Sequence, residues 1–292
     1  MAKPTSALYM PALKWKQGEQ AAIKPLSGAN KSRLLPIAEL PDRPFSWEKN
    51  RYTKSWDKHL EDVAKATATN WGTEHEIAFD QQIGDGESLS SKPGTPWEHL
   101  FDRLWSANVK AVPVLSTLAS AREQAALLNL ARARVKSRWL LRYRSEPHGE
   151  VSTPAHAAIW FSIALRVVGA KKEDVDVVLD LGHVAVDPKA LATGTTQVFK
   201  AVASLGSWRR MALLAGAFPV NLGGVQKGTR QLPRHDWDLY KRVGAKLELE
   251  GIVVGSPEVH ELEDRRREFG VRPSHEARSA RVRAQARVQI PG

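Results

Sequence analysis

The hydrophobic positions along this chain follow two alternating patterns, and residues 175–182 show the first of them. Every second position from Val175 to Leu181 is apolar, which is the spacing of a β-strand with one apolar face. Val178 lies in the middle of the opposite face, so this strand is expected to be buried on both sides. Such a strand is typical of a parallel sheet covered by helices.

The same spacing recurs along the chain and predicts eight strands. They lie at residues 7–14, 34–40, 76–81, 110–116, 138–144, 175–182, 210–217 and 251–256. Between the strands, apolar residues recur every three to four positions, which is the pattern of amphipathic helices. The predicted helices lie at residues 18–24, 53–70, 121–135, 154–168, 188–205 and 233–243, and another starts near Pro96.

Eight strands that alternate with helices are the number found in a closed (β/α)8, TIM-barrel-like domain, and 292 residues suffice for one. We therefore predict an α/β fold with a single barrel-like domain over residues 1–263. An open, doubly wound sheet would show the same alternation and is the alternative. The apolar pattern ends near residue 264, so residues 264–292 are predicted to form a basic, poorly structured tail.

Charged residues on the predicted strands point to one end of the barrel. Because side chains alternate across a strand, the apolar positions decide which charged residues face the interior. The inward charged residues are Lys14, Lys16, Glu39, Asp80, Arg142, Arg144 and Asp180. Nearly all of them fall at the carboxyl ends of their strands, where barrel enzymes keep their active sites.

This set of charges supports two interpretations. In the first, the carboxylates are a catalytic acid and base or oxygen ligands for Mg²⁺, and the cations bind a phosphate or carboxylate substrate. The catalytic candidates are then Glu39, Asp80 and Asp180, and the substrate-binding candidates are Lys14, Lys16, Arg142 and Arg144. In the second, the same groups neutralise one another as an ion-pair network that plugs the barrel.

The overall charge suggests an anionic partner. The chain has 43 Lys and Arg against 32 Asp and Glu, a formal net charge of +11. Eight arginines and two glutamates between residues 265 and 292 supply +6 of this excess. Arg265, Arg266, Arg267, Arg281 and Arg283 are therefore candidate contacts for nucleic acid or an acidic protein, and a merely solvated tail is the alternative.

Several classes of chemistry are excluded or find little support. The chain has no cysteine, which rules out disulfides, zinc–thiolate sites and cysteine nucleophiles. Its histidines lack metal-ligand spacing, so no metal site is predicted, and no cofactor can be assigned. The glycine-rich residues 223–230 lack the P-loop spacing, and Ser116 and Ser256 lack a Gly-x-Ser-x-Gly context. We find no signal peptide or membrane-spanning run and expect a soluble, cytoplasmic protein.

Several short motifs resemble those of the "beta protein" family of phages, prophages and bacterial genomes. They are Tyr9-x-Pro11-x-Leu13-Lys14-x-Lys16-x-Gly18-Glu19, Pro36-x-x-Glu39, a strand ending in Asp80, Phe218-Pro219-x-Asn221 and Pro233-Arg234-x-x-Trp237. The resemblance covers roughly residues 7–255. At its end the chain departs from the family, because Val254-Gly255-Ser256-Pro257 stands where similar proteins carry Gly-Asp-Tyr and continue further.

The resemblance implies a barrel-like domain associated with mobile elements and with phage–host conflict. The matching polar residues are Lys14, Lys16, Glu19, Glu39, Asp80 and Arg234, which adds Arg234 to the substrate-binding candidates. Our leading hypothesis is a phage or mobile-element protein that acts in defence or counter-defence through a nucleic-acid or protein partner. The alternatives are a barrel enzyme acting on a phosphate-containing or other anionic small molecule, and a virion structural or assembly component.

Overall fold

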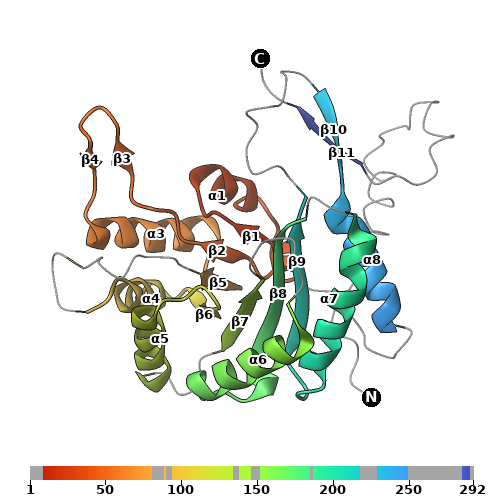
Figure 1. Cartoon of the computed structure of the whole chain (residues 1–292). Helices are drawn as coiled ribbons and strands as arrows, with labels where there is room; N and C mark the ends of the chain where they lie inside the picture. The colour runs from red at the N-terminus through yellow and green to blue at the C-terminus, as the bar shows by residue number, and fades with distance from the viewer. Residues whose placement is uncertain are drawn as a thin grey trace.

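A parallel sheet of seven strands forms the centre of the computed structural model, which describes residues 9–80, 89, 94–133, 138–145, 152–184, 187–217, 229–248 and 285–289. The strand order is β1-β2-β5-β6-β7-β8-β9 (Figure 1). The strands are β1 (Ala12–Leu13), β2 (Ile37–Glu39), β5 (Glu76–Asp80), β6 (Lys110–Ser116), β7 (Trp139–Arg144), β8 (Val175–His183) and β9 (Arg210–Gly216). Each strand therefore pairs with its neighbours in chain order, as in a barrel built from successive βα units.

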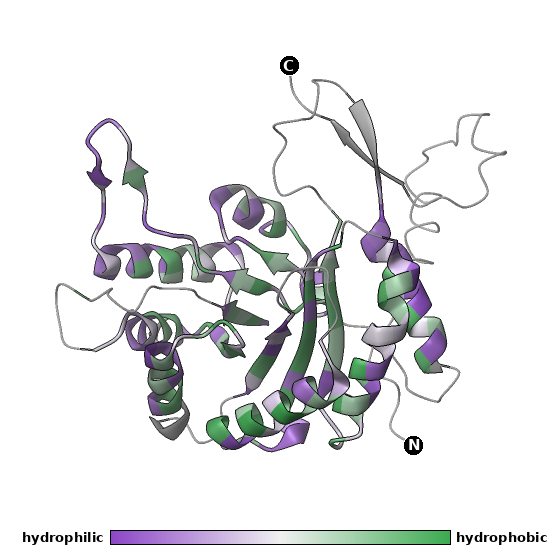
Figure 2. Ribbon diagram, viewed as in Figure 1, coloured by the Kyte–Doolittle hydropathy of each residue, from purple (hydrophilic) through white to green (hydrophobic). Residues whose placement is uncertain are grey.

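Helices connect these strands and lie around the sheet (Figure 1). The main ones are α1 (Gln17–Ile23), α3 (Trp56–Asn70), α4 (Pro96–Ser106), α5 (Ala121–Ala133), α6 (Pro154–Val168), α7 (Pro188–Ala203) and α8 (His235–Glu248). Figure 2 shows the central strands largely in the colour of hydrophobic residues, whereas the helices carry both colours. None of the helices in the described ranges has the length and apolar character needed to cross a bilayer.

Local signals explain where the helices begin. At the start of α4, the Glu98 backbone N–H donates to the Thr95 hydroxyl, and the Thr95 backbone N–H donates to the Glu98 carboxylate. Pro96 occupies the first turn, where no N–H is needed. At the start of α6 the Thr153 hydroxyl accepts from the His156 N–H and Pro154 again occupies the first turn, and Gly169 ends the helix with a φ of 64°.

Ion pairs across the sheet show that it is strongly curved. Arg142 on β7 donates a hydrogen bond to Glu39 on β2, although three strand spacings, about 14 Å in a flat sheet, separate these strands. At the opposite end of the strands, Arg209 beside β9 donates to Glu76 on β5 at 2.8 Å, across four spacings or about 19 Å. The sheet is therefore barrel-like and nearly closed.

Two apolar layers follow the alternation of the strands. The interior layer contains Met10, Leu35, Ile37, Ala78, Val112, Val114, Leu140 and Val178. The outer layer, between sheet and helices, contains the alternate positions, such as Ile77, Phe79, Leu141, Val177 and Leu179. Since both layers are apolar, each central strand is buried on both faces, as the sequence predicts.

The predicted strands agree with the structure as far as it describes the chain. Seven of the eight predicted segments contain a strand of the central sheet, and residues 251–256, the predicted eighth, lie outside the described residues. The fold is thus an α/β barrel-like domain with seven described parallel strands. The exact count of a (β/α)8 barrel stays a prediction.

Several elements were not predicted. They are α2 (Gly28–Lys31), a 3₁₀ turn (Lys172–Asp174) and two small antiparallel sheets, β3 (Phe45–Ser46) with β4 (Arg51–Tyr52) and β10 (Thr229–Pro233) with β11 (Gln285–Gln289). β11 belongs to the segment predicted to lack regular structure. Its pairing with β10 is a long-range contact that local sequence pattern does not report.

Candidate functional site

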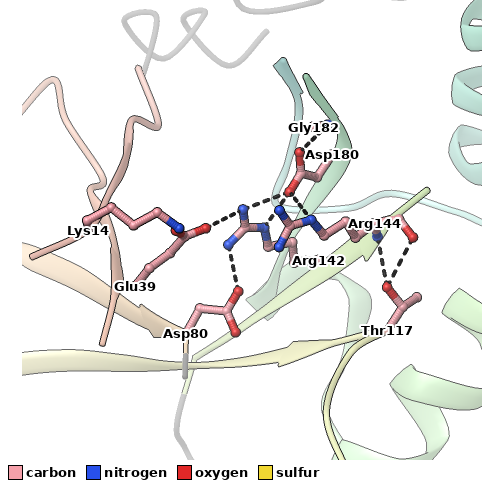
Figure 3. A network of polar contacts seen from close by, with 8 residues as sticks. All are labelled: Lys14, Glu39, Asp80, Thr117, Arg142, Arg144, Asp180 and Gly182. Atoms are coloured by element: carbon pink, nitrogen blue, oxygen red, sulfur yellow. Dashed lines mark hydrogen bonds and ion pairs between the residues drawn. The ribbon is translucent and has the colours of Figure 1, made fainter. Parts of the chain in front are cut away.

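Arg142 lies at the centre of a cluster of charges at the carboxyl-terminal ends of the strands (Figure 3). Its side chain is only 3% exposed. Its Nη1 donates to Asp80 Oδ2 at 2.6 Å, its Nη2 to Glu39 Oε1 at 2.8 Å and its Nε to Asp180 Oδ2 at 2.9 Å. One guanidinium thereby holds three carboxylates from three different strands.

The positions of the carboxylates follow from strand alternation and register. Glu39 and Asp80 end β2 and β5 and are aligned partners in the sheet. Asp180 pairs in register with Arg144 on β7, so it lies at the level of Arg144. The β8–β9 ladder is irregular between Asp180 and His183, and Gly182, with a φ of 62°, donates its N–H to Asp180 Oδ1 at 2.8 Å. This bulge fixes the direction of the Asp180 carboxylate.

Two further cations border this core. Lys14 Nζ lies 2.5 Å from Glu39 Oε2, and 67% of the Lys14 side chain is exposed. Arg144 Nε lies 3.6 Å from Asp180 Oδ2. The Thr117 hydroxyl accepts a hydrogen bond from the backbone N–H of Arg144 and donates one to its carbonyl oxygen (Figure 3). We call Lys14, Glu39, Asp80, Arg142, Arg144 and Asp180 the mouth cluster.

Burial and ion pairing act in opposite directions on the pKa values of these groups. Burial raises the pKa of Asp80 to about 6, although the adjacent Arg142 acts to lower it. Burial also acts to raise the pKa of Glu39, but the charges and hydrogen bonds of Arg142 and Lys14 outweigh it and leave this pKa below its ordinary value. The Arg142 pKa is raised, because its three carboxylate partners outweigh desolvation.

The mouth cluster combines features of both interpretations of the sequence. Three cations and three carboxylates largely neutralise one another, as in an ion-pair network. A buried carboxyl group with a pKa near neutrality is, however, also typical of acid–base sites. The alternative use of the three carboxylates as Mg²⁺ ligands finds no support, because all three pair with Arg142. Among the described residues, no group of three or more potential ligands is placed to hold a metal ion.

Two substrate-binding candidates lie outside this cluster. Lys16 is exposed and begins α1, where its backbone N–H donates to Glu19 Oε2. Trp15 has a φ of 51°, which ends the strand alternation just before Lys16. Arg234 donates two hydrogen bonds of 2.8 and 2.9 Å to Asp236 at the start of α8. Lys16 thus precedes a helix and does not lie within β1, and its predicted place in the ring of inward charges stays a prediction.

Other predicted site residues lie outside the part of the chain that the structure describes. The nucleic-acid candidates Arg265, Arg266, Arg267, Arg281 and Arg283 lie outside the described residues, as does most of the glycine-rich segment 223–230. Their assigned functions stay predictions. The same holds for the catalytic and substrate-binding roles of the mouth cluster, whose positions are now defined.

Sequence reasoning missed several polar residues that organise this region. Thr117 was not predicted because a threonine after a strand is common. Gly182 was not predicted because only the Asp-x-Gly spacing indicates its hydrogen bond to Asp180. The Tyr143 hydroxyl lies 2.6 Å from Ser152 Oγ and 2.7 Å from His156 Nδ1. Tyr143 packs in the outer layer, so this group joins β7 to α6 and does not belong to the mouth.

Fold and site together define an α/β barrel-like protein with a charged, largely self-neutralised mouth at the carboxyl-terminal ends of its strands. The chain belongs to the Beta protein family, whose family model matches residues 9–255. The match covers the whole central sheet and the mouth cluster. No curated protein shows significant similarity to the chain.

Proposed function

We propose that this protein acts in conflict between a phage and its bacterial host by binding an anionic partner, a nucleic acid or an acidic protein, at the barrel mouth. Its membership of the Beta protein family and the motifs that resemble phage and prophage members support the biological setting. The net charge of +11 supports an anionic partner.

Arg144 is the observation that carries the binding site. Its side chain is 19% exposed, and its nearest carboxylate oxygen, at 3.6 Å, is already bound by Arg142. Within the part of the chain that the structure describes, the buried Arg144 Nε has no hydrogen-bond partner. A buried Nε without a hydrogen bond costs free energy, and the rest of this guanidinium is partly exposed, so a phosphate or carboxylate group at the mouth would find an arginine that no carboxylate of the described residues holds by a hydrogen bond.

The binding test compares two arginine variants by calorimetry with inorganic phosphate and with citrate as probes. Arg144→Ala should weaken binding of the preferred probe by about tenfold or more, the loss expected for a charge-assisted hydrogen bond. Arg166→Ala removes an exposed arginine of α6 and should leave affinity unchanged. Equal affinities of wild type and Arg144→Ala would remove the mouth from the proposal.

The biological setting needs a separate test in cells. Host bacteria that express the wild-type protein should change the plating efficiency of infecting phages, and cells with Arg144→Ala should lose this effect at equal protein levels. The Arg166→Ala variant should behave as wild type. If plating is unchanged for a broad set of phages with the wild-type protein, the conflict role is wrong whatever the mouth binds.

The raised pKa of Asp80 favours a second candidate, an enzyme acting on a phosphate-containing or other anionic small molecule. A carboxyl group with a pKa of about 6 can exchange a proton near neutral pH. Glu39 and Asp180 would then position Arg142, and Arg144 would hold the anion.

Nitrophenyl phosphate is a suitable first substrate for a test of this enzyme. Its turnover should vary with pH around 6, and Asp80→Asn should abolish it without unfolding the protein. A pH profile unchanged in Asp80→Asn would exclude this role.

A further inference from the structure

The β3–β4 hairpin is an ordered projection on the connection between β2 and α3 (Figure 1). Phe45 pairs with Tyr52 and Ser46 with Arg51, so residues 47–50 form the turn. Asn50 supplies the left-handed conformation of this turn, with a φ of 44°. The Lys49 N–H donates to Ser46 Oγ, and the Thr53 N–H donates to the Pro44 carbonyl at the base. The hairpin is therefore preorganised.

Three aromatic side chains gather on this hairpin. Phe45 lies edge-on to both neighbours, with ring centroids 4.9 Å from Trp47 and 5.3 Å from Tyr52. Trp47 is nevertheless 86% exposed. Most of an indole is thus held in water on a fixed backbone, where it gains little from burial. An exposed aromatic group in an ordered projection is typical of a binding surface.

The same segment is basic. From residue 43 to residue 54 it carries four cations and one anion, Glu48. Lys49 and Arg51 are exposed, and the structure shows no ion pair for either within the described chain. Arg43 lies over the Tyr52 ring at 4.0 Å and over the Trp56 ring at 5.0 Å, which braces the base of the hairpin.

We infer that the β3–β4 hairpin binds single-stranded nucleic acid, with a base stacked on Trp47 and the adjacent phosphates near Lys49 and Arg51. A flat aromatic face beside cations is the combination by which proteins hold single strands without reading their sequence. Duplex bases are already stacked on one another and would not offer a face to Trp47. None of these hairpin residues belongs to the mouth cluster, so the inference goes beyond the proposed function.

The stacking step is tested by fluorescence anisotropy with short labelled oligo(dT) and oligo(U). Trp47→Ala should weaken binding by about tenfold, the effect of removing one stacked base, whereas Trp47→Phe should keep most of the affinity. Ile159→Ala, which truncates a 59% exposed apolar side chain on α6, is the matched control and should not change binding. Thermal melting of each variant verifies that it is folded.

The charge step is tested by salt dependence. Replacing Lys49 and Arg51 by glutamine should weaken binding and make the dependence of affinity on salt shallower, since fewer counterions are released. Trp47→Ala should leave that dependence unchanged. Equal binding by wild type and Trp47→Ala, or no binding of either oligonucleotide at low salt, would overturn the inference. Arg166→Ala, which removes an exposed arginine of α6, should bind the oligonucleotides normally.

Discussion

Arg142 shows how one side chain can unite distant parts of the chain. Its nitrogens bind carboxylates at positions 39, 80 and 180, so the cation compensates several buried negative charges at once. Removing one member of a buried ionic network leaves the remaining charges buried without a partner. The resulting loss of stability is larger than the net stabilisation that the intact network provides relative to an apolar core.

We therefore expect Arg142→Met to lower the free energy of unfolding by about 3–5 kcal/mol at neutral pH. The destabilisation should shrink in mild acid, where protons neutralise the carboxylates that Arg142 no longer compensates. Urea denaturation at both pH values measures it. Arg166→Met, at an exposed arginine of α6, should change stability by less than about 0.5 kcal/mol. An effect of Arg142→Met as small as that of the control would mean that the network contributes nothing to stability.

Asp80 makes stability depend on pH in a direction opposite to most carboxylates. Its pKa in the folded protein, about 6, exceeds the ordinary value of 3.8, so the folded state binds the proton more tightly. Its stabilising contribution is present at pH 4 and is lost as pH rises through about 6, a change on the order of 2–3 kcal/mol. Asp80→Asn should flatten this slope.

The measurement is the unfolding free energy between pH 4 and pH 7. Asp176, whose pKa burial also raises to about 6, should still contribute in Asp80→Asn, so part of the slope remains. Asp102→Asn, at an exposed position of α4, should retain the full slope. A slope in Asp80→Asn identical to that of the wild type would contradict the raised pKa of Asp80.

The residues of the mouth cluster could be found from sequence because they depend only on strand alternation. Glu39, Asp80, Arg142 and Asp180 lie opposite apolar positions that must face the helices. Lys16 could not be placed, since the positive φ of Trp15 breaks the alternation and no side-chain pattern announces it. The pairing of the charges with one another likewise depends on sheet curvature, which no single strand encodes.

At the scale of elements, the bulge in β8 connects backbone conformation to the mouth. Gly182 holds a φ of 62° and orients Asp180 through its N–H. A side chain at this position strains the left-handed backbone, so Gly182→Ala should lower the unfolding free energy by about 1–2 kcal/mol. It should also weaken any ligand binding that depends on Arg144, the neighbour of Asp180.

Gly244 provides a control for which the expected change in stability has the opposite sign. It lies within α8 with open space around its Cα, so Gly244→Ala should raise stability by about 0.5–1 kcal/mol through helix propensity. Chemical denaturation of both variants distinguishes the two cases. If Gly182→Ala were as stable as wild type, the left-handed conformation would not be required at the bulge.

Long elements could be predicted from sequence, and short ones could not. β6 and α6 have the predicted limits because seven and fifteen residues provide several repeats of their pattern. β3 and β4 have two residues each, too few for any periodicity. The hairpin with the exposed Trp47 was missed for this reason.

At the scale of the whole molecule, the tail holds more than half of the net charge. Replacing Arg265, Arg266, Arg267, Arg281 and Arg283 by glutamine keeps the length of the chain, including β11. If these arginines bind phosphates, nucleic-acid affinity should fall, and the slope of its logarithm against the logarithm of salt concentration should decrease by about 0.9 for each phosphate that is no longer neutralised. Anisotropy at several salt concentrations measures both effects.

Lys65→Gln, on the exposed face of α3, is the control for loss of one surface cation outside the tail and should shift affinity little. An unchanged affinity and salt slope in the five-arginine variant would mean that the tail is merely solvated, which is the alternative interpretation of its sequence.

The overall architecture could be predicted from the order of strands and helices alone, whereas closure of the sheet requires contacts between strands far apart in the chain.

Those distant contacts have a consequence for synthesis. Glu39 leaves the ribosome long before Arg142 and Asp180, and at about 5–20 residues per second the delay before Arg142 emerges amounts to roughly 5–20 seconds. Until then the early carboxylates have no cation from β7, so Lys14 can compensate Glu39 but collapse of the amino-terminal half would desolvate Asp80 without Arg142. We therefore expect the amino-terminal half to compact late during synthesis, with closure becoming favourable once the Arg142 guanidinium has emerged.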